Sequence, residues 1–446
     1  MIFLILFLLV CNVAIPLVFV FRQCTSKGRI ELNHVLLFTI GYLAYWITPI
    51  AVGESHLFET APGMPLWYGV FDRIPQETVL LYLFMALSIY LAFCAGVLLC
   101  RHLRPGINTD TRRLFFDRRL LNVYLALGLT AAFIYTLTFR NALFRGYTLN
   151  NVDPSAGEHG SFVAVSIFLL SLAILYSLKR QENAPNIRFW QAISHHFFVS
   201  YFVVAVLVLS LGGRLYFLSS VIMLGVYRTV YFQTLSYRTF FFSALVALAA
   251  VGGIGTLRLG AGVSVGDGLF NLITEPLYNS FSLMQFLADG RFDLIKAPLF
   301  LAGDFINLIP TVILPGKGAL LLNPDNYGYH VFSPLGSLST FFSFMINFGI
   351  LGTLAVMFLV GFFLQLLRSR GRSLLSKTTY IMLCGWLATS FFRDPFAASL
   401  VKSMFQYSVL LPAIVVFSAS LVTYWLVEAP RRVAADAGNT GALEND

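Results

Sequence analysis

The sequence predicts an all-α, polytopic membrane protein. Hydrophobic residues make up 58% of the 446 residues, charged residues only 11%, and the mean hydropathy is +0.77. Soluble domains carry about 25% charged residues. The apolar residues also fall in runs of roughly 20, the length that crosses a bilayer as one helix. Residues 1–427 are therefore expected to form a single transmembrane domain, and residues 428–446 a polar tail.

Eleven apolar runs are the expected crossings. The first lacks the basic start and small-residue cleavage site of a signal peptide, so it is expected to remain as a helix. The turn around Arg214 is read as a tight hairpin, with one broken helix as the alternative. The runs are residues 2–21, 34–53, 79–100, 120–139, 161–178, 192–211, 215–232, 240–257, 339–367, 379–392 and 405–427. Between the eighth and ninth lies the one long interruption, residues 258–338, which is expected to be an ordered external loop of turns and short helices.

Basic residues set the orientation. They cluster in every second connection, at residues 22–29, 101–119, 179–188, 228–238 and 368–377, and again at 431–432. The positive-inside rule places these connections and the C-terminal tail in the cytoplasm, and the N-terminus and the long loop outside. The net charge of +9 is then a cytoplasmic excess, which indicates contact with anionic lipid headgroups more than with nucleic acid.

Several chemistries have no signature in the sequence. The five cysteines fall in apolar runs or cytoplasmic connections, so no disulfide is expected. Metal-ligand Cys/His spacing, a Gly-rich phosphate loop and a Walker pattern are all missing from the sequence. We therefore expect no metal, no cofactor and no nucleotide-driven pump.

Three arginines are expected at the outer edge of the membrane. Arg214 lies at the hairpin tip, Arg258 follows the eighth crossing, and Arg393, with Asp394 beside it, follows the tenth. A guanidinium at this depth needs a partner, although any single one could snorkel to the headgroups. Three at one level favour a shared anion, and the planar arginine fork suits phosphate. The expected ligand is the diphosphate of a lipid-linked sugar.

Arg214 is followed after ten residues by Gly225, and this R-x10-G pattern resembles the Wzy-type bacterial polysaccharide polymerases, such as the O-antigen and enterobacterial common antigen polymerases. Later stretches agree with the common-antigen branch: IPTVILPG at 309–316, NPDN at 323–326, SPLGS at 333–337 and FGILG at 348–352. The resemblance covers roughly residues 212–402. A second R-x10-G is missing, because Arg291 is followed at that distance by Ala302, and many members have more than eleven crossings.

The resemblance implies an enzyme at the periplasmic face of the bacterial inner membrane. Such polymerases move a growing chain from undecaprenyl diphosphate onto the non-reducing end of a new lipid-linked repeat unit. The chain would then be an inverting, metal-independent glycosyltransferase whose donor and acceptor are both undecaprenyl-diphosphate-linked oligosaccharides. A chain-length regulator and a flippase are further partners in such systems.

This chemistry assigns roles to residues present. The three arginines, with Lys317 as a fourth cation, would neutralise the leaving diphosphate. His330 is the leading candidate for the base that takes the proton of the attacking hydroxyl, because an imidazole titrates near neutrality. Asp394 and Asp304 are rival bases. Further candidates for substrate binding are Arg291, Glu275, Tyr278, Asn326 and Tyr327.

Each role has a structural alternative. His330 lies among aromatic residues and could simply pack there. Asp394 beside Arg393 is better explained as half of an ion pair, and Asp304 could cap a short helix. Tyr278 and Tyr327 could stack on sugar rings, but anchoring the loop at the membrane interface is the more common role for tyrosine.

Two rival functions stay open. An O-antigen ligase shares the resemblance and the outward arginines, but transfers the glycan to a lipid A core. A flippase or another transporter for lipid-linked oligosaccharide belongs to a different class. Transporters usually carry internal repeats and polar residues at mid-membrane, which this sequence does not show.

Overall fold

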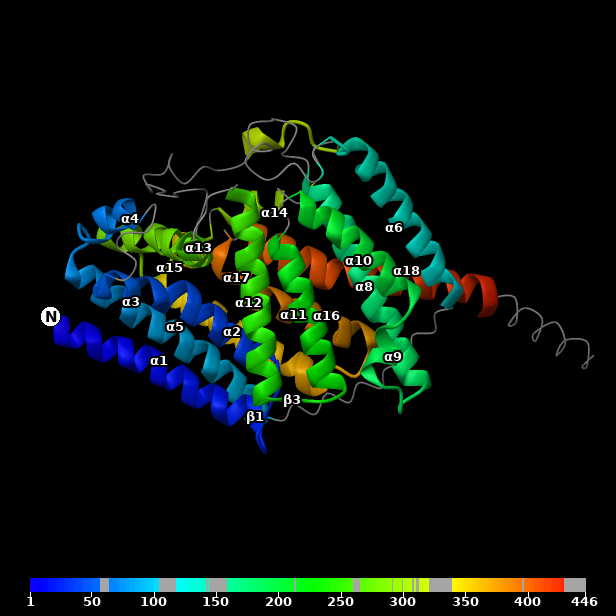
Figure 1. The fold of residues 1–446 in the computed structure, drawn as a ribbon, viewed down its shortest axis with the longest axis horizontal. Coiled ribbons are helices and arrows are strands. Elements are labelled where there is room, and N and C mark those ends of the chain that lie inside the picture. The colour runs from blue at the N-terminus through cyan, green and yellow to red at the C-terminus, as the bar shows by residue number, and fades with distance from the viewer. Residues whose placement is uncertain are drawn as a thin grey trace, which may run out of the picture. The chain divides into compact units, whose positions relative to one another are not determined.

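The computed structural model describes residues 1–56, 64–103, 118–141, 143, 159–211, 214–259, 265–290, 292–298, 300–306, 309, 313–320, 339–394 and 397–428. These residues are almost entirely helical, which confirms the all-α prediction (Figure 1). Seven helices are long and apolar enough to cross a membrane: Ile2–Cys24, His34–Ser55, Gln76–Leu103, Arg119–Thr138, Phe162–Asn183, Thr340–Arg370 and Leu400–Leu426. His196–Ser210 and Leu215–Tyr231 are shorter apolar helices.

The chain divides into two compact units. Unit 1 comprises Met1–Pro105, Arg214–Arg370 and Tyr380–Gln406, and unit 2 comprises Gly106–Gly213, Gly371–Thr379 and Tyr407–Asp446. The single transmembrane domain expected from the sequence stays a prediction. The candidate site residues that the structure describes all belong to unit 1.

Unit 1 is built on the first helices and the long helix before residue 370. Its elements are α1 (Ile2–Cys24), β1 (Thr25–Ser26), β2 (Arg29–Ile30), α2 (His34–Tyr42), η1 (Leu43–Ile47), α3 (Thr48–Ser55), α4 (Met64–Phe71), α5 (Gln76–Leu103), α11 (Arg214–Tyr231), β3 (Leu235–Ser236), α12 (Tyr237–Leu259), α13 (Val265–Ala288), α14 (Leu301–Ile306), η3 (Lys317–Leu320), α15 (Thr340–Arg370) and α17 (Ser390–Arg393). Helix α5 packs against both α1 and α15.

Unit 2 is a smaller helical group. It contains α6 (Arg118–Thr138), α8 (His159–Asn183), α9 (Phe189–Ile193), α10 (His196–Ser210), α18 (Leu411–Thr423) and η7 (Tyr424–Glu428). Helix α8 is central, because it contacts α6, α10 and α18. Helices α16 (Leu374–Leu387) and η6 (Ala397–Leu410) each have residues in both units.

A helix is present in each of the eleven predicted runs, but five runs are not continuous α-helices. The run at 192–211 is interrupted between α9 and α10, and the run at 405–427 is π-helical at both ends, in η6 and η7. The run at 34–53 widens into the π-helical turn η1, just before Pro49, whose ring cannot donate a backbone hydrogen bond. The run at 339–367 is broken at Gly349, with φ of 70° and ψ of −174°. The run at 379–392 begins earlier, at Leu374, and is interrupted between α16 and α17.

The stretch predicted as turns and short helices contains one long helix instead. Helix α13 has 24 residues and packs against α5, η1 and α3. Leu277, Phe281 and Met284 are buried at helical spacing. The polar residues at the start of this helix hid its apolar face in the sequence, so the prediction of only short helices was wrong for this part of the stretch.

Two glycines allow α5 and α15 to touch backbone to backbone. A Cβ atom on Gly96 would lie 2.0 Å from the Phe358 carbonyl oxygen, and one on Gly361 would lie 2.2 Å from the Phe93 carbonyl oxygen. Both approaches are far inside van der Waals contact, so only glycine fits at either position. Helices in lipid associate through close packing at small residues, and this crossing is such a contact.

A short sheet closes one end of unit 1. Strand β1 pairs with β2 (Thr25 with Ile30), and β2 pairs with β3 (Ile30 with Leu235), all antiparallel. Lys27 and Gly28 between the first two strands have φ of 48° and 73°, as a tight hairpin requires. The connections at residues 22–29 and 228–238, which the charge pattern assigns to the cytoplasm, therefore meet at one end of this unit.

Alanine at either crossing glycine should separate the two helices. We expect Gly96→Ala and Gly361→Ala each to lower the free energy of unfolding by about 1–3 kcal/mol, because the added methyl overlaps a backbone carbonyl that cannot move alone. Thermal melting of the purified protein in detergent measures this. Gly69→Ala in α4 is the matched control, because nothing lies within 4 Å of its Cβ position. Unchanged melting of both crossing variants would contradict the close packing.

Candidate functional site

The short helix α17 and its C-cap, residues 390–394, contain two of the predicted site residues, Arg393 and Asp394, and are called the Arg393 turn below. The Arg393 Nη1 atom lies 3.2 Å from Asp394 Oδ1, and the two side chains are 32% and 20% exposed. The Ser390 hydroxyl donates to the other carboxylate oxygen, Oδ2. Both oxygens of Asp394 thus have donors, which is the ion-pair geometry that the sequence offered as the alternative to a catalytic base.

Two other helices fix the backbone of this turn. The Asn279 amide in α13 donates to the Arg393 carbonyl oxygen at 2.7 Å, and the Thr340 hydroxyl at the start of α15 donates to the Asp394 carbonyl oxygen. The Ser390 hydroxyl also lies 3.3 Å from that of Ser403. Side chains from α13 and α15 therefore fix the backbone that carries the guanidinium and the carboxylate.

Helix α11 contacts the chain just before Ser390. Its Ser219 hydroxyl lies 2.9 Å from the Thr389 hydroxyl. Arg214 is the first residue of α11, five positions before Ser219, and its side chain lies outside the described part of the structure. The convergence of Arg214 with Arg393 on one anion therefore stays a prediction.

Aromatic rings lie beneath the turn. Phe391 and Phe392 are fully buried, and Phe392 packs against Phe38 and Phe341 at centroid distances of 5.1 and 5.5 Å. Water is excluded on this side, so charge interactions at Arg393 are less screened than at a wet surface.

The remaining predicted residues are placed only in part. Arg258 is the second-to-last residue of α12, Glu275 lies in α13, Asp304 in α14, and Lys317 begins η3. The structure describes the backbone of these four residues but not their side chains. Arg291, Asn326, Tyr327 and His330 lie outside the described residues.

Tyr278 is a buried core residue. Its ring meets Phe281 edge to face at a centroid distance of 5.7 Å, and burial raises the pKa of its phenol. This is the packing role that tyrosines in such a stretch often have. In the described part of the chain this ring is covered by neighbouring residues, so it is not placed to stack on a sugar.

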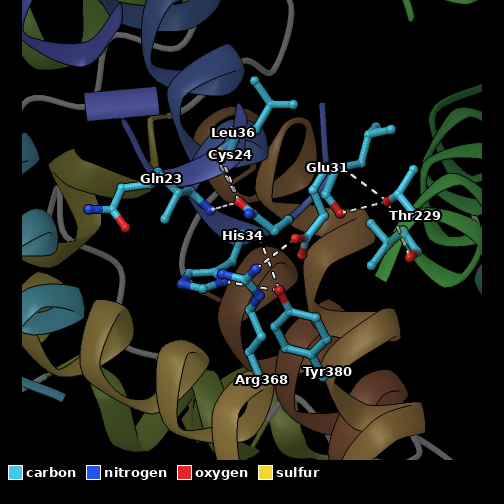
Figure 2. Close-up of polar contacts among 12 residues, drawn as sticks. Gln23, Cys24, Glu31, His34, Leu36, Thr229, Arg368 and Tyr380 are labelled. Atoms are coloured by element: carbon cyan, nitrogen blue, oxygen red, sulfur yellow. Dashed lines mark hydrogen bonds and ion pairs between the residues drawn. The ribbon is translucent and has the colours of Figure 1, made fainter. Parts of the chain in front are cut away.

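A second polar cluster lies at the end of unit 1 that carries the short sheet, and Figure 2 shows it. Glu31 and Arg368 form an ion pair at 2.7 Å in which each side chain is 19% exposed. The His34 Nδ1 atom lies 3.0 Å from the Tyr380 hydroxyl. In addition, Arg101 donates to Gln23. In the sequence, Arg368 and Arg101 indicate only orientation, and this network was not predicted.

One sequence signal marks part of the cluster. Asn33 directly precedes the second apolar run, and in the structure its carboxamide oxygen accepts from the backbone N–H groups of Val35 and Leu36 as an N-cap. The cap fixes the start of α2, and with it His34, which is fully buried. The long-range partner Tyr380 could not be read from local pattern.

The structure gives no sign of a metal centre in the part that it describes. Among those residues, no group of three or more His, Cys, Asp or Glu side chains is placed to hold an ion. In the Arg393 turn the guanidinium is the group that suits an oxyanion, and Asp394 is its partner in the structure.

Loss of the Glu31 carboxylate should destabilise unit 1. We expect Glu31→Ala to lower the free energy of unfolding by about 1–3 kcal/mol, because a partly buried guanidinium loses its carboxylate. Lys179→Ala is the control: Lys179 lies 3.6 Å from Glu182 in an i,i+3 pair that is more exposed, and surface pairs contribute about 0–1 kcal/mol. Equal melting temperatures for the two variants would show that the Glu31–Arg368 pair adds no more than a surface pair.

Known proteins offer no direct comparison for this arrangement. No protein-family model, curated protein or solved structure matches the chain. The polymerase resemblance therefore depends on the motif residues quoted above, and the function has to be argued from the residues themselves.

Proposed function

We propose that this chain is a membrane-embedded glycosyltransferase that polymerises undecaprenyl-diphosphate-linked oligosaccharide repeat units into a polysaccharide of the O-antigen or common-antigen type. The observation that carries the proposal is the Arg393 turn, where a half-buried guanidinium follows two buried aromatic residues, Phe391 and Phe392. The hydrogen bond between Ser219 of α11, the helix that Arg214 begins, and Thr389 supports the proposal that both arginines serve one anion.

The proposed chemistry needs charge more than it needs a cofactor. When the glycan leaves the lipid carrier, negative charge develops on the diphosphate, and arginines positioned beforehand stabilise it. Asp394 acts in this proposal as a positioning residue, because its carboxylate fixes one end of the Arg393 fork. Arg258 and Lys317 would complete the cation set from α12 and η3, and His330 would accept the proton of the attacking hydroxyl.

The proposal includes a topology of eleven crossings in the bacterial inner membrane. It places the N-terminus, the 258–338 stretch and the Arg393 turn on the periplasmic side, and the short sheet and the C-terminus in the cytoplasm. The positive-inside pattern supports this orientation, as does the ion pair that joins Arg368 to the connection after α1. Donor and acceptor lipids would then approach from the outer leaflet, where flipped precursors reside.

A transporter for the same lipid is the second candidate, and the break in α15 is the observation in its favour. Transporters bind substrate at discontinuous helices near mid-membrane. The break at Gly349, however, is about 28 Å from Arg368 at about 1.5 Å per residue, close to a full hydrocarbon thickness. A break at the membrane boundary fits a surface reaction better than a mid-membrane binding site.

Glycan length after gene deletion tests the proposal. Loss of a polymerase leaves single repeat units on the lipid A core, because units still cross the membrane and are still attached. A ligase deletion would leave no glycan on the core, and a flippase deletion no exported glycan at all. Glycan bands on a gel distinguish these outcomes, and wild-type polymer in the deletion strain would exclude all three.

Arg393→Ala in the complementing gene should reduce polymer by about 10²–10³-fold, because one group that neutralises the leaving phosphate is lost. The Arg393→Lys variant should make an amount of polymer between those of the wild type and Arg393→Ala, because lysine keeps the positive charge but lacks the planar guanidinium. Arg22→Ala, at an exposed arginine in the last turn of α1, is the control. We expect Arg214→Ala and Arg258→Ala to behave like Arg393→Ala at normal membrane abundance. Normal glycan length in any two of the three would refute a shared anion site.

His330→Ala should abolish polymer if the imidazole is the base. The base must be neutral to accept a proton, so wild-type polymerisation should rise as the pH passes about 6.5, the ordinary pKa of histidine. Measuring polymer formation by membrane vesicles from pH 5 to 8 tests this for both proteins. Full activity of the variant would instead transfer the role to Asp394 or Asp304.

A further inference from the structure

The break in α15 is closed by a segment from the preceding connection. The Ile350 and Leu351 N–H groups donate to the carbonyl oxygens of Asp293 and Leu294 at 3.1 and 3.0 Å. In return, the Lys296 N–H donates to the Phe348 carbonyl oxygen at 3.2 Å. The segment 293–296 thus satisfies the backbone groups that end one half of α15 and begin the other, groups that hydrocarbon could not satisfy.

Gly349 makes this docking possible. A Cβ atom there would lie 2.7 Å from the Asp293 carbonyl oxygen and 2.9 Å from that of Leu294, and the positive φ of 70° also favours glycine. The position of the segment along α15 is therefore fixed by both backbone shape and hydrogen bonds, with little room to slide.

The length of α15 sets the depth of the segment in a bilayer. From Arg368, whose ion pair with Glu31 marks the polar end, to Gly349 the helix rises about 28 Å at about 1.5 Å per residue. The hydrocarbon core is about 30 Å thick. The segment therefore lies at the opposite boundary, where hydrocarbon gives way to headgroups.

The tip of the segment is apolar and exposed. Leu294 and Ile295 are 62% and 72% exposed, and Asp293 and Lys296 on either side form an ion pair at 3.6 Å. The Leu294 carbonyl oxygen accepts a hydrogen bond from the Leu351 N–H group, and Leu351 is itself exposed. The apolar tip therefore lies beside an exposed apolar residue of α15. Leu359 and Phe363 extend the same helix's exposed apolar residues toward its other end.

We propose that Leu294 and Ile295 insert into the hydrocarbon of the outer leaflet, so that the connection between α13 and α15 binds the lipid surface at this tip. The occupant is the acyl-chain region of the leaflet, because the tip is bonded to a helix long and apolar enough to cross a membrane, beside its exposed residue Leu351. The charged residues on both sides would remain at the headgroups, as in other interfacial anchors. The insertion requires that α15 crosses the bilayer, and its assignment to the outer leaflet also rests on the proposed orientation; neither depends on the reaction catalysed.

Spin labels on single cysteines test the insertion in lipid nanodiscs. Leu294→Cys and Ile295→Cys are made in a Cys11→Ala background, because the four other cysteines are buried. Leu359→Cys on α15 is the hydrocarbon control, and Asp289→Cys, exposed at the end of α13, is the water control. Collisions with oxygen and with a water-soluble nickel chelate are measured by power-saturation EPR.

We expect labels at both tip positions to collide with oxygen more than with nickel, as at Leu359→Cys, and the label at Asp289→Cys to show the reverse. Nickel accessibility equal to that at Asp289→Cys would overturn the proposal. So would protection from both reagents, which would mean that protein covers the tip. If Leu294→Cys fails to fold, Ile295→Cys alone decides, because its side chain is the more exposed of the two.

Discussion

The crossing of α5 and α15 is the constraint on which the rest of unit 1 depends. Gly96 and Gly361 each face a carbonyl of the other helix, so two backbones meet with no side chain between them. Such a contact has one register, because moving either helix by a residue would place a larger side chain against a carbonyl. Packing at small residues is the main source of helix association in lipid, where no hydrophobic effect drives helices together. The crossing thus fixes the height of α15 relative to the rest of the unit.

That height determines what the two ends of α15 can do. At its C-terminal end, Arg368 reaches Glu31 in the connection after α1, beside the short sheet (Figure 2). At its N-terminal end, Thr340 holds the backbone of Asp394, next to the guanidinium proposed to bind phosphate. One helix therefore links a charge pair that anchors the fold to the turn that carries the proposed chemistry. The proposed anion site is therefore positioned by residues from distant parts of the unit.

Sequence reasoning predicted the helices well and their interruptions poorly. Apolar runs of about 20 residues are a strong signal because the bilayer sets their length. The break at Gly349 carried no such signal: the glycine lies in an unbroken apolar run, and its cause, the segment at Asp293, is over 50 residues away. The partners of Arg393 were equally hidden, since Asn279 and Thr340 come from distant helices. The position of a charged residue such as Arg393 could be predicted from the sequence. The distant residues that fix its backbone could not be predicted.

The three-stranded sheet has a consequence for how this chain is made. Strand β2 at Arg29 needs β3 at Ser236 as its second neighbour, and about 200 residues of chain must be synthesised between them. At about 5–20 residues per second, this edge waits roughly 10–40 s after leaving the ribosome. During that interval the hairpin of β1 and β2 is an open template for other strands, and its basic tip, with Lys27 and Arg29, discourages such pairing. These basic residues would then also protect the nascent chain from aggregation.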